Sequence, residues 1–559
     1  MKRLLTVLIV LVLIFTSTVA CTQKSNNEAS STEAVSTNTV APTTTQVEVK
    51  NLNPTGLPIV KDKITITAMQ QKDPRFGQLD KLWTTLWLEE KTNIHIEYEE
   101  IDQQSWVQKK QLAFASNELP DIFIAAVLTT NDEVLYGADG KMLAPLNELI
   151  DKYAPNILQA FSDYPVCKPS ITAPDGNIYA LPSISEGPLM LGIDRTFINK
   201  KWLDNLGMAM PKTVEEMYSV LKAFKEKDPD RNGQNDTIPL SGRIGVDPEK
   251  EVQNTIRMYF YAYGLSGNRI SISTKDKSKI EYSPYTPEYE KILTELNRLY
   301  KEGLMDSDYF IQTAPELKAK SSEVRVGVCN WGAPFGMGGM PDPANYLQYE
   351  GVYPLVSEAG AKPIWRGVDI IEEGNFAMSA KNKNPEATIR WADYLYSEEA
   401  GIKLYFGPDV GEWDQTKEYG NYIDSNGKVA GKLPEGKTKF LYTVSTWSNR
   451  ALTLRVPKLA YKEAFAPTDT ALSETLNKAQ APFRYDLFPR VYFDTKDQER
   501  LIVLEADIKS YVDQMEAKFI TGVEPLSNFK SYLENLKKIG VEEYIKINQG
   551  AYDVFLKNQ

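Results

Sequence analysis

Residues 63–126 decide the fold, and they read KITITAMQQKDPRFGQLDKLWTTLWLEEKTNIHIEYEEIDQQSWVQKKQLAFASNELPDIFIAA. Apolar side chains alternate with polar ones over residues 64–68 and again over residues 94–98, and this period of two predicts a strand in each place. Between them, the apolar residues of the segment 79–86 are spaced three and four apart, as on one face of a helix. The stretch therefore begins as strand, helix, strand.

A second helix and a third strand complete this stretch. Ser105 and Gln108 form a candidate capping box for the helix, which Pro120 ends. Residues 121–125 then read as a short buried strand. The order strand, helix, strand, helix, strand predicts a parallel sheet with right-handed crossovers.

The size and charge of the chain limit its class. At 559 residues it is too long for a single core, so at least two lobes are expected. The formal net charge is −12, and the loss of Lys2 and Arg3 with an N-terminal leader would make it −14. A chain this acidic is a poor candidate for binding nucleic acid or an anionic membrane surface.

The single histidine, His95, excludes several kinds of site. No multi-histidine metal centre is possible, and a catalytic triad would have to use a histidine in the middle of a predicted strand, where a half-exposed side chain is expected. Three cysteines are too few for a cysteine-rich scaffold or a zinc site of four thiolates. Cys167 and Cys329 are candidate free thiols, unless the fold brings them together.

The N-terminus has the features of a lipoprotein leader. Two basic residues, an apolar run too short to span a bilayer and a set of small residues predict that residues 1–20 are a signal peptide. The residues Val19-Ala20-Cys21 resemble a bacterial lipobox, which implies lipidation of Cys21; the alternative is an ordinary secretory peptide with a chance cysteine. Residues 21–58 are rich in polar side chains and are predicted to form a disordered tether.

A turn and strand further along the chain carry a family resemblance. The run Pro174-Asp175-Gly176-Asn177-Ile178-Tyr179-Ala180-Leu181-Pro182 combines an Asp-Gly turn, which favours positive φ, with a strand. It resembles a hallmark of the bacterial extracellular solute-binding proteins of family 1, the receptors of sugar ABC importers. In that family the phrase lies just before the chain first crosses between two lobes.

The resemblance extends over nearly the whole mature chain. Residues 112–121 resemble the family's first-lobe helix and turn, and residues 192–207 resemble the strand and helix that open the second lobe. Residues 384–399 resemble the helix that follows the return to the first lobe, and residues 518–522 and 544–552 resemble the C-terminal helices of Gram-positive lipoprotein members. The order and spacing of these phrases together indicate the family.

The resemblance implies an α/β fold of two lobes, with a ligand cleft between them and a helical C-terminal extension. The expected boundaries place residues 59–183 and 366–410 in the N-terminal lobe, and residues 184–365 and 411–559 in the C-terminal lobe. The resemblance also implies a carbohydrate ligand, an ABC permease as partner and no catalytic residue. We expect a monomer that is held on the extracellular face of the cell membrane only by its lipid.

A loop rich in oxygen donors is a candidate calcium site. The donors at EF-hand positions one, three, five, seven and nine are Asp228, Asp230, Asn232, Gln234 (through its carbonyl) and Asp236. Gly233 at position six allows the sharp bend, but Pro239 stands at position twelve, where a bidentate glutamate belongs. Alginate-binding members of the family have a similar loop with bound calcium and an acid after position nine, where this chain has Thr237. The alternative is a polar turn without metal.

Aromatic rings can stack on the apolar faces of sugars, so the tryptophans divide into two groups. The five on predicted helices have the spacing of packing residues, and they are Trp83, Trp87, Trp106, Trp202 and Trp391. The four at strand ends or in loops are candidate ligand-stacking residues, and they are Trp331, Trp365, Trp413 and Trp447. For each of these four the alternative is a loop anchor packed on its own lobe.

Polar residues near these rings and strand ends are candidate partners for sugar hydroxyls. Ligands gather at the carboxyl ends of parallel strands, so the set begins with the residues after the first strand and includes one acid after the crossing strand. The set is Gln70, Gln71, Glu186, Arg366 next to Trp365, and Arg450 with Asn449 after Trp447. Arginine forks bind hydroxyl pairs or carboxylates, but they form structural ion pairs equally often.

The sequence therefore predicts a receptor that captures a carbohydrate, expected to be an oligosaccharide, by hinge closure and delivers it to an ABC importer. The alternative is a secreted carbohydrate-active hydrolase that uses paired carboxylates, since aspartate and glutamate are plentiful. A third possibility is a peptide-binding or structural surface protein. A hydrolase would release reducing ends from candidate glycans, whereas a receptor would bind them unchanged, and ligand screening separates the third possibility from both.

Overall fold

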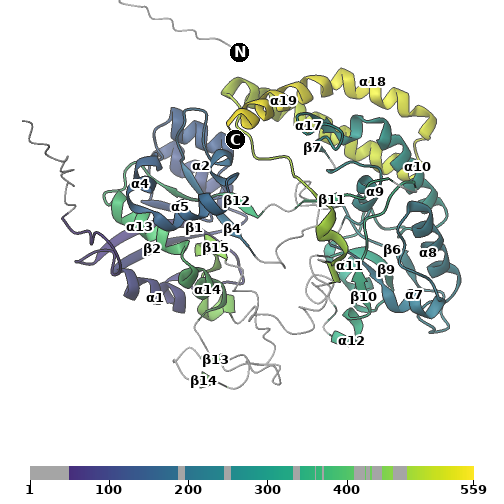
Figure 1. Cartoon of the computed structure of the whole chain (residues 1–559), viewed down its shortest axis with the longest axis horizontal. Helices are drawn as coiled ribbons and strands as arrows, with labels where there is room; N and C mark the ends of the chain where they lie inside the picture. The colour runs from purple at the N-terminus through teal and green to yellow at the C-terminus, as the bar shows by residue number, and fades with distance from the viewer. Residues whose placement is uncertain are drawn as a thin grey trace, which may run out of the picture. The chain divides into compact units, whose positions relative to one another are not determined.

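The computed structural model describes residues 50–186, 195–244, 254–267, 269–331, 340, 342–358, 361–367, 370–407, 422–423, 429–430, 443–456, 475–476 and 478–558. Cys21, Trp413 and the signal peptide lie outside these residues. Within them, the strands form two main sheets, and each sheet has its own covering helices (Figure 1).

The first sheet has six strands in the order β15-β4-β12-β3-β1-β2. Their bounds are β1 Ile64–Lys72, β2 Ile94–Asp102, β3 Ile122–Ile124, β4 Ala180–Ser185, β12 Ile371–Met378 and β15 Arg455–Val456. β1 pairs in parallel with both β2 and β3, so the parallel order expected for residues 63–126 is confirmed. The sheet as a whole is mixed, because β12 runs antiparallel to β3 and to β4.

Helices cover the first sheet. They are α1 Trp83–Thr92, α2 Trp106–Ser116, α3 Thr130–Asp132, α4 Asn147–Tyr153, α5 Pro155–Asp163, α6 Cys167–Ser170, α13 Pro385–Leu395 and α14 Glu398–Phe406. Shorter 3₁₀ or π turns are η1 Leu79–Lys81, η2 Glu133–Asp139, η4 Thr443–Trp447 and η5 Arg450–Leu452. We call this sheet and its helices the first lobe.

Two local expectations for the first lobe are wrong. The Ser105 side chain makes no cap hydrogen bond, because the residue already has helical dihedral angles of φ −93° and ψ −9°. Leu86, expected on the buried face of the first helix, is 54% exposed. The reason is that η1 precedes α1, so α1 begins at Trp83 and buries Thr85 and Leu88 instead.

The second sheet has four strands in the order β10-β5-β9-β6. Their bounds are β5 Thr196–Asn199, β6 Ile238–Leu240, β9 Val326–Asn330 and β10 Tyr349–Gly351. β6 and β9 are parallel, so their carboxyl ends meet at one edge, whereas β5 is antiparallel to both β9 and β10. Three two-stranded ribbons are also present: β7 Ile270–Ile272 with β8 Ile280–Tyr282, β11 Trp365–Arg366 with β16 Arg484–Tyr485, and β13 Tyr422–Ile423 with β14 Val429–Ala430.

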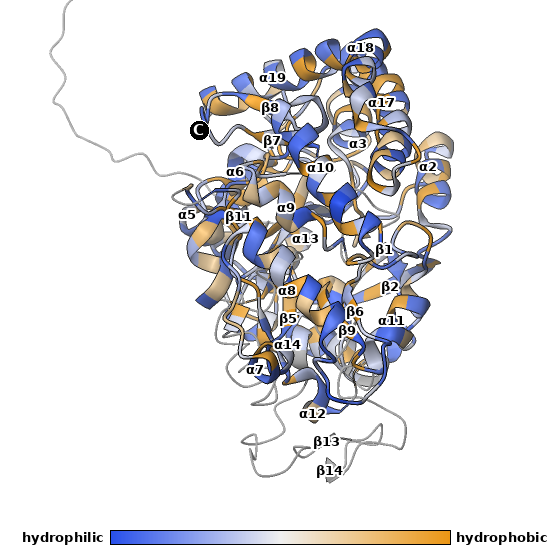
Figure 2. Cartoon of the chain, turned by 90° about the vertical axis from the view of Figure 1, so that its right-hand side faces the viewer, coloured by the Kyte–Doolittle hydropathy of each residue, from blue (hydrophilic) through white to orange (hydrophobic). Residues whose placement is uncertain are grey.

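The helices around the second sheet include the C-terminal extension. They are α7 Lys200–Leu206, α8 Val214–Glu226, α9 Arg257–Ala262, α10 Pro287–Lys301, α11 Ala314–Ser322, α12 Pro343–Tyr346, α17 Thr495–Thr521, α18 Phe529–Ile539 and α19 Val541–Asn558, with short turns η3 Ser283–Tyr285, η7 Ala481–Phe483 and η8 Leu526–Asn528. α17 lies beside α10 (Figure 1), and the two share one hydrophobic core. Figure 2 shows apolar and polar residues alternating along α17 and α18, as expected for helices with one buried face. We call this sheet and its helices the second lobe.

The structure moves two of the expected boundaries. Leu52 is buried and bridges Val60, so the end of the predicted tether 21–58 belongs to the folded protein. Residues 443–456, expected in the C-terminal lobe, add β15 to the first sheet beside β4. Both contacts join segments that local composition cannot connect, which is why the sequence did not predict them.

Candidate functional site

The carboxyl edge of the first sheet is closed by a pair of buried amides. Gln70 lies in register with Ile124, the last residue of β3, and has no exposed surface. Its Nε2 donates to Asn449 Oδ1 and its Oε1 accepts from Asn449 Nδ2, each over 2.9 Å. The backbone N–H of Asn449 donates to Thr84 Oγ1 at 2.9 Å. The structure thus brings together two candidates that lie far apart in the sequence, and Gln71 beside them is half-buried.

Glu186, a candidate acid after β4, is held by an arginine that sequence reasoning missed. Arg455 Nε donates to Glu186 Oε1 at 2.5 Å, and its Nη2 donates to Asp163 Oδ2 at 2.8 Å. Burial lowers the pKa of Arg455, but the two carboxylates outweigh burial and raise it overall. No local signal marks Arg455, because the pairing of β15 with β4 brings Glu186 to it, and its other partner, Asp163, comes from α5.

The corresponding edge of the second sheet is charged. Ser241, just after β6, donates to Asp306 Oδ2 at 2.6 Å, and Lys320 Nζ contacts both oxygens of Asp306 at 2.9 and 3.0 Å. Burial raises the pKa of Asp306, but the hydrogen bonds from Ser241 and Lys320 outweigh it and hold the pKa below its usual value. Gln312 completes the cluster through Nε2, 3.2 Å from Asp306 Oδ2.

Three of the four candidate stacking tryptophans are buried. Trp331 has no exposed surface and packs between Phe197 and Tyr349, with ring centroids 6.1 and 5.0 Å away. Trp365 is 2% exposed and packs on Tyr261 at 5.0 Å. In this structure these rings have the surroundings of core residues and expose almost no face to a ligand.

The other predicted stacking residues differ in their surroundings. Trp447 is 2% exposed, and a Cβ on Gly407 would lie 2.9 Å from its ring, so glycine permits this close approach. Arg450 places its guanidinium 3.9 Å from the centroid of the Tyr405 ring. Arg366 is half-buried in β11, and Trp413 lies outside the described residues.

The tryptophans expected to be packing residues also divide. Trp106, Trp202 and Trp391 are buried, as expected for a helix face toward the core. Trp83 and Trp87 on α1 are only half-buried, and their rings stack with centroids 5.7 Å apart and planes 12° apart. Spacing on a helix therefore identified the buried rings correctly in three cases out of five.

Two side-chain oxygens of the candidate calcium loop accept hydrogen bonds from its own backbone: Asp228 Oδ2 from the N–H of Gly233 at 3.1 Å and Asn232 Oδ1 from the N–H of Gln234 at 2.6 Å. Asn232 Nδ2 donates to Asp230 Oδ2 at 2.8 Å and lies 3.4 Å from Asp236 Oδ1, while Gly233 has φ +76°. Burial first, and then the neighbouring Asp228 carboxyl, raise the pKa of Asp230. Arg325 Nε lies 3.3 Å from Asp236 Oδ2. The donors are all hard oxygens at alternating positions, which is the chemistry that calcium prefers.

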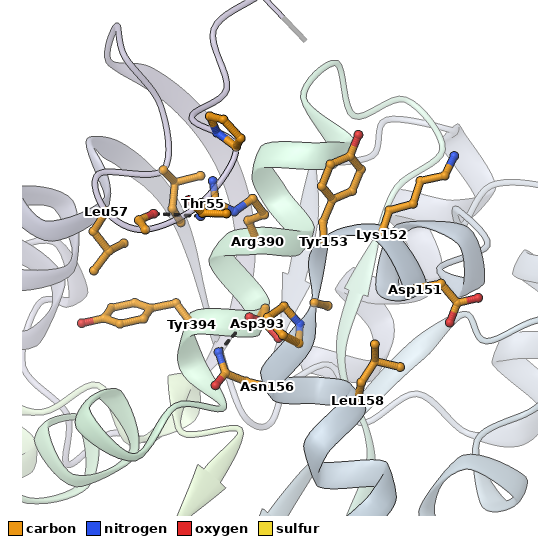
Figure 3. Close-up of a pocket in the computed structure, with 15 residues that line it drawn as sticks. Thr55, Leu57, Asp151, Lys152, Tyr153, Asn156, Leu158, Arg390, Asp393 and Tyr394 are labelled. Atoms are coloured by element: carbon orange, nitrogen blue, oxygen red, sulfur yellow. Dashed lines mark hydrogen bonds between the residues drawn. The ribbon is translucent and has the colours of Figure 1, made fainter. Parts of the chain in front are cut away.

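A pocket of about 450 Å³ lies on the first lobe, between the segment 54–59 and helices α4, α5 and α13 (Figure 3). Arg390 Nη2 donates to the Gly56 carbonyl at 2.8 Å and so holds the N-terminal segment against α13. Asp393 accepts from Asn156 Nδ2 at 2.8 Å. Of the predicted ligand residues that the structure describes, none lines this pocket, so it is separate from the edges of the two sheets.

The structure also bears on membrane-spanning helices, metal clusters, the cysteines and the single histidine. No helix in the part of the chain that the structure describes is long and apolar enough to cross a bilayer. Over the same residues, no three His, Cys, Asp or Glu side chains converge as a metal site. Cys167 and Cys329 are both buried and neither forms a disulfide. His95 lies in β2, half-exposed as expected, with Nδ1 2.7 Å from Glu89 Oε2.

Comparison with known proteins finds relatives that are solute-binding proteins. Residues 71–302 match the model of the bacterial extracellular solute-binding protein family. The fructooligosaccharide ABC transporter substrate-binding protein FusA of Streptococcus pneumoniae is 26% identical over 492 residues, which cover 84% of this chain and 87% of FusA. The polygalacturonan/rhamnogalacturonan-binding protein YtcQ of Bacillus subtilis is 26% identical over 245 residues, 43% of this chain and 45% of YtcQ.

Solved structures share the fold. FusA in complex with kestose, and an EF-hand mutant of FusA in complex with fructo-nystose, each superpose with a TM-score of 0.68 at 23% identity, covering 89% of this chain and 100% of theirs. A solute-binding protein of Bifidobacterium longum infantis, described as binding HMO, has a TM-score of 0.73 at 23% identity over 88% of this chain and 99% of its own. The resemblance seen in the sequence is confirmed: this chain is a two-lobed α/β relative of the bacterial extracellular solute-binding proteins.

Proposed function

We propose that this protein is a receptor that binds an oligosaccharide outside the cell and delivers it, unchanged, to an ABC importer. The observation that carries the proposal is the similarity to FusA, a fructooligosaccharide receptor, which spans 84% of this chain. The ligand class we propose is therefore a short oligosaccharide, with fructose-containing sugars as the first candidates. The role requires binding and release, and no covalent step.

The proposed ligand-binding residues lie at the carboxyl edge of the first sheet, in the turn η5 and in the β11–β16 ribbon. Gln71, Arg366 and Arg450 are half-buried, so each keeps surface with which it could reach a sugar hydroxyl. Gln70 is hydrogen-bonded to Asn449 and Glu186 to Arg455. We propose that these two residues position their neighbours and do not contact the sugar themselves. This assignment follows from the chemistry of sugars, which need donors and acceptors around an apolar ring face.

Titration of the purified protein with sugars tests the proposal. Kestose and nystose should raise the melting temperature and give a saturable heat in calorimetry, because a ligand that binds only the folded state stabilises it. Maltotriose serves as a matched control of similar size. Recovery of unchanged sugar after long incubation separates a receptor from a hydrolase; new reducing ends would favour the hydrolase.

We further propose that Cys21 carries a lipid that holds the mature protein at the membrane. Support comes from the Val19-Ala20-Cys21 resemblance to a lipobox and from the polar segment that follows it. In the native host, Cys21→Ala should release the protein from the membrane fraction or leave it unprocessed. Unchanged processing and membrane recovery of this variant would refute the proposal.

We also propose that the loop 228–236 binds Ca²⁺. Its side-chain oxygens come from Asp228, Asp230, Asn232 and Asp236, with the Gln234 carbonyl as a further donor. Burial, followed by the neighbouring Asp228 carboxyl, raises the pKa of Asp230, and a bound cation would favour its charged form. Arg325 lies 3.3 Å from Asp236 Oδ2 and supplies the positive charge on that side of the loop. Asp230→Ala should lower the melting temperature in calcium but not in a chelator. Identical wild-type melting in calcium and chelator would exclude a stabilising site.

A further inference from the structure

The loop that follows β3 is held in a strained conformation. Ala125 and Val127 have φ of +47° and +46°, in the left-handed region that non-glycine residues rarely adopt. Val127 is β-branched, which makes this conformation more costly, and it is 52% exposed. Strain of this kind persists only where the surroundings over-determine the backbone, and it is common at functional sites.

Three consecutive carbonyls of this loop accept hydrogen bonds from three side chains. Trp106 Nε1 donates to the Ala126 carbonyl at 3.0 Å, and Lys110 Nζ donates to the Val127 carbonyl at 3.2 Å. Arg490 Nη2 donates to the Leu128 carbonyl at 2.7 Å. The first two donors come from α2, next to the loop in the first lobe. The third comes from a segment more than three hundred residues further along the chain.

The backbone of β12 binds the same loop from the other side. The N–H of Ala126 donates to the Asn375 carbonyl, and the N–H of Leu128 donates to the Gly374 carbonyl, each over 3.0 Å. A Cβ on Gly374 would lie 2.2 Å from the Leu128 carbonyl oxygen, so only glycine permits this approach. The loop is thus fixed on both sides at the edge of the sheet where ligands gather.

Arg490 is part of a small buried cluster. Its Nη2 also lies 3.1 Å from Glu133 Oε1, and Tyr492 donates to Glu133 Oε2 at 2.6 Å. Glu133 has no exposed surface, and Arg490 keeps 14% of its side-chain exposure. Nη1 of Arg490 has no hydrogen-bond partner among the described residues. Arg490 therefore joins the loop 125–129 to the turn η2 that follows it.

The segment that carries Arg490 has two faces. Tyr492 packs against the core of the first lobe, whereas Val491 and Phe493 pack against cores of the second lobe. Side chains of an extended segment alternate in direction. In the run 490–493, residues 490 and 492 therefore contact the first lobe, and residues 491 and 493 contact the second. α17 begins directly after it and is fixed to the second lobe, where Tyr289 donates to Glu516 Oε2 at 2.7 Å.

We propose that Arg490 is a positioning residue for the loop 125–129 at the carboxyl edge of the first sheet, and that through this loop the C-terminal extension controls the proposed sugar site. The inference rests on the proposed receptor function for its ligand. The run 490–493 contacts both lobes. A movement of the second lobe would therefore alter the hydrogen bond from Arg490 to the Leu128 carbonyl. The C-terminal helices then contribute to affinity without lining the site.

The test uses a double variant that avoids an unpaired buried charge. Removal of Arg490 alone would leave Glu133 buried without its cation, which is strongly destabilising; burial already raises the pKa of Glu133. Arg490→Met with Glu133→Gln removes both charges and keeps similar volumes. The control is Arg500→Met, which breaks an exposed ion pair with Glu543 on the same extension.

Hydrogen exchange measures the stability of the loop 125–129 in the absence of sugar. In the double variant, the amides of Ala126 and Leu128 should exchange about tenfold faster, equivalent to about 1.4 kcal/mol of local opening, while β1 and α10 exchange as in wild type. Arg490→Lys retains a donor and should restore part of the protection. Unchanged loop exchange, equal acceleration throughout the first lobe, or no restoration by lysine would each overturn the proposal.

Sugar affinity provides the second readout. The double variant should bind kestose about tenfold more weakly than wild type, and the Arg500→Met control should bind it as wild type does. Equal affinity in the double variant would overturn the link between Arg490 and the site. If wild type binds none of the sugars, the receptor function fails, and hydrogen exchange alone then decides whether Arg490 positions the loop.

Discussion

The edges of the two sheets carry different chemistry. At the first edge a neutral pair, Gln70 with Asn449, closes the end of β1. At the second edge the buried Asp306 pairs with the partly exposed Lys320 beside β6, and the ring of Trp331 fills the end of β9. The difference teaches that charge and dense packing stabilise the second edge, whereas neutral hydrogen bonds stabilise the first. It follows that pH and truncation should affect the two edges unequally.

The largest expected effect is at Trp331. Because this ring is fully buried between Phe197 and Tyr349, Trp331→Ala should lower the free energy of unfolding by about 3–5 kcal/mol. Urea unfolding followed by circular dichroism measures it. Trp331→Phe is the matched control, because it keeps an aromatic ring and should cost less. A fully stable Trp331→Ala variant with weak sugar binding would instead make Trp331 a ligand-stacking residue, as the sequence predicted.

A charge-dependent effect is expected at Asp306. Its pKa is below the ordinary 3.8 in the folded protein, so its carboxylate stabilises the fold above that pH, and the stabilisation is lost as pH falls through the folded pKa. Asp306→Asn weakens hydrogen bonds to a charged group, so it should cost about 1.5–3 kcal/mol at pH 7, and the variant should show less further loss in acid than wild type.

Asp308→Asn is the control for this prediction. Asp308 also contacts Lys320, but its side chain is 51% exposed, and exposed pairs contribute little. Thermal melts between about pH 3 and pH 7 compare the three proteins. Parallel pH profiles for wild type and Asp306→Asn would show that another group causes the acid sensitivity.

A smaller effect, independent of pH, is expected at the first edge. Asn449→Ala leaves the buried Gln70 amide without its partner, which should cost about 1–3 kcal/mol. Replacement of both residues by leucine removes the unpaired groups and should cost less than the single change. Urea unfolding at pH 5 and pH 8 should give the same loss. A double variant less stable than Asn449→Ala would mean that the amide pair has a net stabilising role.

The sequence predicted what depends on neighbours along the chain. The alternation in residues 64–68 and 94–98 and the helix between them established the first strands, because burial of one face requires those periods. It could not predict that Gln70 meets Asn449, 379 residues away, or that Glu186 meets Arg455, 269 residues away. Trp331 was assigned to a ligand because it ends a strand, although the rings that cover it come from β5 and β10.

The smallest expected effect concerns Trp83 and Trp87 at the first lobe. Their rings stack 5.7 Å apart, and Trp87 also lies 6.0 Å from Tyr394. Aromatic pairs contribute about 0.5–1.5 kcal/mol beyond their buried area, and half-buried rings lie at the lower end. Single alanine variants and the double variant form a thermodynamic cycle, in which we expect a coupling of about 0.5 kcal/mol. α1 follows β1 in a parallel crossover, so its first turn lies near the carboxyl edge of the sheet. A loss of kestose affinity in Trp83→Ala, with the stability nearly unchanged, would therefore make this half-exposed ring, rather than the buried Trp331, the one that contacts the sugar.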